Sequence, residues 1–161
     1  MSSDFLLKID GVTGESIDKD VKEAIEIDSS SWGVQHPGTF SDGTQGGASG
    51  QSHFSDITFS TRASKASPTL ANFCAIGQHI KKVELHVRKA TGKGGQKDYY
   101  IVKLEDCLIS TYHSSVMSDA SAIDSFSINY AKINFDFKPQ KKEGDLDTAV
   151  NFDYDLRVRG K

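Results

Sequence analysis

The chain has 161 residues, 37% hydrophobic and 25% charged, which is typical of a single globular domain. Its net charge of −3 argues against a protein that binds nucleic acid without regard to sequence, because such a protein needs a basic face. No stretch approaches the roughly 20 apolar residues of a membrane-spanning helix, and the N-terminus lacks the apolar core of a signal peptide. We therefore expect one domain, residues 1–161, made and folded in the cytoplasm.

The first part of the chain is predicted to form short strands. Residues 5–9 are a short apolar run, and the charged segment 14–24 is predicted to be a solvated connection. Ile25 and Ile27 alternate with acidic residues, which indicates a half-buried strand that continues through three serines to the only Trp, Trp32. We expect Trp32 to be an anchor in a core or an interface.

Residues 33–53 form a long connection rich in Gly and Ser. Between Phe40 and Phe54 the only apolar side chain is Ala48, so the segment cannot bury enough surface to offset the entropy of ordering it. A connection of this length in a compact domain is usually functional or disordered. The sequence therefore predicts a β-domain with one long arm that requires a partner.

A strand over 53–62 and one helix over 67–77 follow the arm. Ser67 is predicted as the N-cap, Pro68 as the first helical residue, and Gly77 as the left-handed C-terminal residue. The apolar stripe of this helix consists of Leu70, Phe73 and Cys74. Because ten residues are marginal alone, the helix is expected to pack against a sheet.

The rest of the chain again has the period of β-strands. Residues 81–88 alternate, 90–98 form a turn, and 99–109 are apolar on both parities, as in a central strand. The glycines of the turn resemble a phosphate loop, but the Ser or Thr of that motif is missing and the segment joins two strands, which favours a hairpin.

A Ser-rich segment, 111–121, is predicted to be a loop. The apolar stripe of the strand over 126–137 changes parity near residues 131–132, which predicts a β-bulge. After a polar linker at 141–147, residues 150–158 alternate as the last strand.

No catalytic constellation is found in the sequence. The five His residues share no spacing typical of metal sites, so neither a metal nor another cofactor is predicted. Cys74 and Cys107 are either a disulfide or metal pair or two buried thiols, and a reducing cytoplasm favours the thiols. The chain is therefore not expected to be an enzyme.

An ordered set of stretches resembles Hcp, the haemolysin-coregulated tube protein family of bacterial type VI secretion systems. The stretches cover nearly the whole chain and include the Gly-rich arm. They are FLLKIDGVTGES (5–16), SWGVQ (31–35), SPTLANFCAIGQH (67–79), RKATG (88–92), YYIVKLEDCLISTYHSS (99–115) and INFDFKPQK (133–141).

This resemblance implies a closed antiparallel β-barrel of two packed sheets, with one short helix and a long loop at 33–53. It also implies homo-hexameric rings that stack head to tail into a tube. A contractile sheath drives the tube, with its spike, out of the cytoplasm to the medium or a target cell, and effector proteins travel in the lumen. Neither nucleic acid nor membrane insertion is part of this expectation.

The resemblance also suggests roles for individual residues. Ser31 and the adjacent Ser30 are expected to face the lumen and contact cargo. The residues expected at contacts between subunits or rings lie in and beside the arm: Trp32, Gly33, Thr39, Phe40, Asp42, Gly46, Gly47 and Gly50.

Two other hypotheses from the sequence remain open. The chain could be a monomeric secreted β-domain that binds a glycan or a protein through its Gly/Ser-rich arm. It could also be a structural protein of a phage or a gas-vesicle-like assembly, a reading that differs from the first mainly in genomic setting. An oligomeric mass would separate the monomeric domain from the ring.

Overall fold

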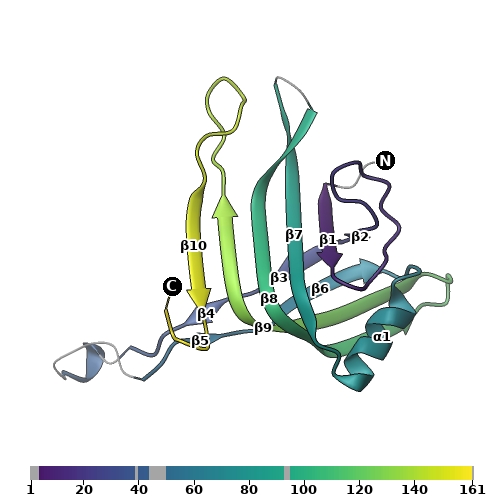
Figure 1. Ribbon diagram of the computed structural model, residues 1–161, viewed down its shortest axis with the longest axis horizontal. Helices are drawn as coiled ribbons and strands as arrows, with labels where there is room; N and C mark the ends of the chain where they lie inside the picture. Colours follow the sequence, from purple (N-terminus) through teal and green to yellow (C-terminus); the bar gives the residue numbers. More distant parts are fainter. Residues whose placement is uncertain (1–3, 39, 44–49, 93–94, 161) are drawn as a thin grey trace.

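The computed structural model describes residues 4–38, 40–43, 50–92 and 95–160, and it is mainly β with one α-helix (Figure 1). None of the helices in these ranges is long and apolar enough to cross a membrane. The elements are β1 (Phe5–Ile9), β2 (Ile25–Glu26), β3 (Ser29–Ser31), β4 (Val34–Gln35), the 3-10 helix η1 (Phe40–Asp42), β5 (His53–Phe54), β6 (Ile57–Arg62), α1 (Ser67–Ile76), β7 (Ile80–Thr91), β8 (Gly95–Val116), β9 (Ala122–Phe137) and β10 (Val150–Asp155).

One antiparallel sheet contains all strands but two. Its order is β2-β1-β7-β8-β9-β6-β3, β10 also pairs with β9, and β4 and β5 form a separate ribbon. The sheet is strongly curled (Figure 1). In the described residues its two end strands are joined by the chain at Ile27 and Asp28, not by a ladder. The predicted closed barrel of two packed sheets is therefore not confirmed, and the sheet is an open half-barrel.

The continuous strand predicted from residue 25 to Trp32 is wrong, because this segment changes partners. The Ile27 amide donates to the carbonyl of Phe5 in β1, whereas the Asp28 amide donates to the carbonyl of Ser60 in β6. The segment thus pairs with one end of the sheet as β2 and with the other end as β3. One short piece of chain contacts both ends of the curled sheet.

The long strands β8 and β9 bend at the same place. The side on which the buried residues lie changes between Leu104 and Cys107 in β8, and between Tyr130 and Ile133 in β9. These two changes lie opposite each other in the ladder, whose register does not shift there. The bulge predicted in β9 is therefore wrong; the register shift lies in β8, after Ile109.

The Ser-rich segment predicted as a loop is also mostly strand. β8 continues to Val116 and β9 begins at Ala122, so only a short turn separates them. Strand propensity depends strongly on cross-strand neighbours, and in this segment Ser114 lies opposite Asp124 and Ser115 opposite Ile123 of β9. At the end of the chain, β10 stops at Asp155 instead of reaching residue 158.

The helix α1 is confirmed, with one change at its start. Its N-cap is Ala66, and Ser67 is the first helical residue, whose hydroxyl donates to the buried carboxylate of Asp124. The hydroxyl of Tyr112 donates to the same carboxylate over 2.9 Å. Gly77 closes the helix in the left-handed conformation, as predicted. Hydrogen bonds and the buried Leu70 thus fasten α1 to the sheet.

Residues 14–24, here called the strap, are more than a solvated connection. Val21 and Ala24 are buried with Leu6 in a small apolar cluster of their own, separate from the main core. Gly14 lies so close to the carbonyl of Ala24 that a Cβ atom would clash with the backbone. The strap therefore packs tightly over β1.

Candidate functional site

Small hydroxyl side chains line one face of the sheet, across β3, β6, β9 and the second half of β8. The strand register places them in two neighbouring rows. One row consists of Ser31, Thr58, Ser127 and Thr111. The other row consists of Ser29, Ser60, Ser125 and His113. We call these eight residues the hydroxyl face. Most of them are exposed, and none is Asp, Glu, Lys or Arg.

Hydroxyl groups of this face hydrogen-bond to one another. The Oγ of Ser31 lies 2.8 Å from the Oγ1 of Thr58, and the Oγ1 of Thr111 lies 2.5 Å from the Oγ of Ser127. A hydroxyl group offers one donor and two acceptor positions, so each retains capacity for a further partner. The face can therefore bind polar groups of either kind while carrying no formal charge apart from any on His113.

The bend of β8 and β9 marks where this uncharged face ends. Beyond it, residues of alternating charge lie opposite one another across four strands. They are Lys82, Glu105, Lys132 and Asp155. At the border, the carboxylate of Asp56 accepts hydrogen bonds from Ser110 (2.7 Å) and Asn129 (2.8 Å).

The structure separates the two serines that were expected to face a lumen together. Ser31 lies exposed on the hydroxyl face, whereas Ser30 is half-buried and lies opposite Phe59 of the core. The Oγ of Ser30 is buried and has no hydrogen-bond partner among the described residues. Only Ser31 is therefore placed to meet a ligand on this face.

Trp32 packs against the core, which is one of the two roles expected for it; its expected place at a contact between subunits or rings stays a prediction. Its ring packs against Phe135 with a centroid separation of 5.6 Å, and its Nε1 donates to the hydroxyl of Tyr100 over 3.1 Å. The next residue, Gly33, is held by Ser55: its amide donates to the Ser55 Oγ (2.9 Å), and its carbonyl accepts from the Ser55 amide (3.0 Å). These contacts lie where the arm begins.

The arm leaves the body on the ribbon of β4 and β5 and projects to one side (Figure 1). Phe40 in η1 is 81% exposed, and no atom of the described residues lies within 4 Å of the position that a Cβ on Gly50 would take. Asp42 ends η1. The other arm residues expected at interfaces, Thr39, Gly46 and Gly47, lie outside the described residues.

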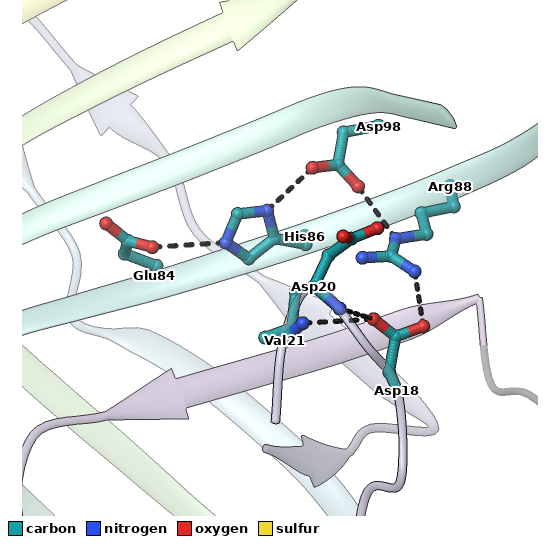
Figure 2. A network of polar contacts seen from close by, with 7 residues as sticks. All are labelled: Asp18, Asp20, Val21, Glu84, His86, Arg88 and Asp98. Carbon is teal, nitrogen blue, oxygen red and sulfur yellow. Dashed lines mark hydrogen bonds and ion pairs between the residues drawn. The ribbon is translucent and has the colours of Figure 1, made fainter. Parts of the chain in front are cut away.

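A network of charged side chains links the strap to β7 and β8 (Figure 2). The side chain of Arg88 is 7% exposed and lies between two carboxylates, with Nη1 2.5 Å from Asp18 and Nε 2.9 Å from Asp98. His86 lies 2.9 Å from Asp98 and 3.2 Å from Glu84.

These contacts shift the pKa values of the network. The hydrogen bond to Asp98 raises the pKa of His86 above its ordinary value, against the effect of burial. The hydrogen bond from Arg88 lowers the pKa of Asp18. Within the described ranges, no group of three or more His, Cys, Asp or Glu side chains is arranged to hold a metal ion. The network's evident role is to fasten the strap.

Sequence reasoning singled out Ser31 but missed the rest of the hydroxyl face. A signal was present, because Ser or Thr alternates with apolar residues at positions 58 and 60 and again at 125 and 127. Only the register of the four strands shows that these positions form one surface with Ser31.

Comparisons with known proteins agree on one family. Residues 6–137 match the family model described as "Type VI secretion system effector, Hcp". The chain is 31% identical over 160 residues to protein hcp1 of Pseudomonas aeruginosa. This match covers 98% of the chain and 97% of the relative.

Solved structures show the same fold. A type six secretion system protein superposes with a TM-score of 0.89 at 24% identity, covering 98% of both chains. A type VI secretion system effector from Yersinia pestis gives a TM-score of 0.75 at 26% identity, covering 94% of this chain and 99% of that one. Taken with the family match over most of its length, these similarities show that the chain belongs to the Hcp family of type VI secretion system proteins.

Proposed function

We propose that this chain is a non-enzymatic tube subunit that forms stackable hexameric rings and carries effector proteins in their lumen. The observation that carries the proposal is the four-stranded part of the sheet, β3-β6-β9-β8, which has a hydroxyl face and an open edge at each end. The ring number comes from the family resemblance.

The two open edges give neighbouring copies a way to pair. Among the described residues, β3 has a strand neighbour only in β6, and residues 108–116 of β8 have one only in β9. Open strand edges are templates for pairing with another chain. If the β3 edge of one copy meets the β8 edge of the next, the contact is heterologous and closes into a ring at the right rotation.

Such a ring turns the hydroxyl face of every copy to the same side. We propose that this side is the lumen, because an uncharged wall with free hydrogen-bonding capacity holds a polar cargo without trapping it by charge. Ser31 lies at one end of a hydroxyl row and is exposed, so it is the residue we assign to cargo contact.

Exposed apolar side chains near the arm also favour assembly. Val150 is 68% exposed, Phe152 37% and Val34 52%, and Val150 and Phe152 belong to the edge strand β10. Exposed apolar patches commonly mark interaction sites. We propose that neighbouring subunits or rings cover them, and that the arm reaches across the same contact. The sheath and spike are the further partners, and the protein is proposed to be ejected from the cytoplasm with the tube.

The test begins with the oligomeric mass of the full chain, measured by native mass spectrometry together with negative-stain images. A hexamer with a central hole supports the proposal, whereas a monomer at every concentration contradicts it and favours a monomeric binding domain. In the hexamer, Ser31→Gln should reduce the amount of co-purifying effector while the ring stays intact. Ser31→Thr, which keeps the hydroxyl, is the matched control.

The role of the arm is tested separately by deleting residues 42–50. The described body makes its core contacts without these residues, so the monomer should fold with an unchanged circular dichroism spectrum. Ring stacking, counted as tube length in negative-stain images, should fall. Tubes of normal length would contradict the assignment of the arm to contacts between rings.

A further inference from the structure

We infer that β10 and the tail after it clamp both legs of the arm and set the direction in which the arm leaves the body. The first leg is residues 32–35 and the second is residues 52–55. The consequence for assembly rests on the proposed function, whereas the clamp itself rests on the contacts described below.

The described part of the arm's own ribbon is short. Among the described residues the β4–β5 ladder has two residue pairs, Val34 with Phe54 and Gln35 with His53, and Gly38 forms a single bridge further out. An isolated two-stranded ribbon is marginally stable at best. Contacts between Gly33 and Ser55 extend it by hydrogen bonds but do not connect it to the main sheet. The orientation of the arm must therefore come from contacts with the body.

Phe152 of β10 contacts both legs. Its ring stacks on Trp32 of the first leg, with a centroid separation of 6.5 Å and an interplanar angle of 20°. It also stacks on Phe54 of the second leg, at 6.4 Å and 18°. One side chain of the last strand thus lies between the two legs and holds their aromatic anchors in one stack.

Tyr154, two residues further along β10, holds the second leg a second time. Its ring stacks on Phe54 at 4.8 Å and 29°, and its hydroxyl lies 3.4 Å from the Oγ of Ser52. Phe152 and Tyr154 are themselves nearly parallel, at 6.4 Å and 12°. Each aromatic pair adds a modest stabilisation beyond the area that it buries, and several pairs in one stack restrict motion together.

The tail after β10 completes the clamp from another direction. Asp155 and Gly160 exchange backbone hydrogen bonds, so the tail turns back on the end of the strand. This turn brings Arg159 to the second leg, where its Nη1 donates to the carbonyl of Ser52 over 3.0 Å. Two consecutive pieces of the C-terminal segment therefore hold the second leg.

Beside the clamp lies an open groove of about 480 Å³ that the ribbon and the C-terminal segment line together. Val34 and Phe54 line it from the ribbon, and Phe152, Tyr154 and Arg159 line it from the C-terminal segment. The ribbon therefore has room to move on this side once the aromatic stack is removed. Phe152 is the positioning residue, since among the described residues it alone contacts an aromatic ring in each leg.

Hydrogen exchange read by mass spectrometry tests the clamp in the full chain. Phe152→Ala should speed exchange at least tenfold in peptides that cover 33–38 and 50–55, with less than a twofold change in peptides of β8 and β9. Phe152→Tyr should restore the wild-type rate. Val150→Ala, on the same strand but without a stacking partner in the described residues, is the matched control and should leave the rate unchanged.

The second readout is assembly. Phe152→Ala should shorten tubes in negative-stain images, and Phe152→Tyr should not. Unchanged exchange at the legs, or an equal rise in the legs and in β8 and β9, would overturn the clamp. Faster exchange at the legs with tubes of normal length would overturn its role in directing the arm. If the wild-type chain forms no rings, the proposed function fails while the exchange result still decides the clamp.

Discussion

Replacing Arg88 by Ala should destabilise the fold far more than its single charge suggests. The side chain is 7% exposed, and it pairs with Asp18 of the strap and Asp98 of β8. Removing one partner of a buried ion pair typically costs about 3–5 kcal/mol, because it leaves uncompensated buried charge.

The contacts of the two carboxylates place the expected cost at the lower end of that range. After the substitution, Asp18 still accepts the amides of Asp20 and Val21, and Asp98 keeps His86. We therefore expect a loss of about 3 kcal/mol. For a chain of this size, 1 kcal/mol shifts the melting temperature by about 2–4 °C, so the Tm should fall by about 6–12 °C.

The assay is urea unfolding of the two arginine variants Arg88→Ala and Arg157→Ala beside the wild type. Arg157 also has two carboxylate partners, Asp155 and Asp106, at 2.9 and 2.8 Å, but its side chain is 52% exposed. Exposed pairs contribute little to stability. Arg157→Ala should therefore leave the urea midpoint nearly unchanged, while Arg88→Ala lowers it with little change in slope.

Equal losses in the two variants would refute the reasoning, because burial could then not be the cause. A loss below about 1 kcal/mol for Arg88→Ala would refute it as well, since that is the scale of a surface ion pair. Selective loss of protection in the strap, seen by hydrogen exchange, would add that the network holds residues 14–24 in place.

Two further predictions concern the strap and its network. Because the pKa of His86 is raised, its contribution to stability is present below the ordinary value of 6.5 and is lost as the pH rises through the raised pKa. Thermal melts from pH 5 to 9 should show this decline in stability, and His86→Gln should flatten it. Gly14→Ala should lower the Tm sharply, because the new Cβ would clash with the backbone of Ala24. Gly33→Ala is the control and should not lower it, because the new Cβ would lie 4.0 Å from its nearest neighbour, the Oγ of Ser55. Equal melting temperatures of the two variants would contradict this reasoning.

Local patterns in the sequence were sufficient to predict the elements in which local preference and burial favour the same structure. The helix from Ser67 to Ile76 follows from Pro68, Gly77 and an apolar spacing of three and four residues. In β1, Leu7 and Ile9 lie opposite Leu85 and Val83, and in β6, Ile57 and Phe59 lie opposite Ile128 and Phe126, so the apolar residues that predicted these strands have apolar partners. In these segments local preference and burial agree, and such agreement makes an element readable without its neighbours.

Elements that depend on a distant partner could not be predicted in the same way. The serines after Thr111 form strand only because residues of β9 lie opposite them, and composition alone indicated a loop. The break between β2 and β3 arises because Ile27 and Asp28 bond to different strands. No local signal distinguishes these cases from an ordinary loop or a continuous strand.

The candidate site shows the same limit. The family resemblance pointed to Ser31, but which of two adjacent serines is exposed depends on strand parity, which a single break in the strand resets. The network around Arg88 joins residues 70 positions apart in the chain. Periodicity cannot reveal such a pair, because it reports only the face on which a side chain lies.

The strand order has a consequence for how the chain is made. The centre of the sheet, β7 to β9, comes from the second half of the sequence, and its outer strands β1, β2, β3 and β6 come from the first. A ribosome therefore delivers the margins of the sheet before the strands that they border. Until β7 has emerged, β1 has only its short partner β2, and until β9 has emerged, β6 has only its short partner β3. In these intervals their apolar sides stay open to other chains. The nascent chain is thus most exposed to aggregation while only its first half has been made. That exposure ends when the antiparallel pairs of β7 to β10, built from contacts close in sequence, form and cover the apolar sides of the outer strands.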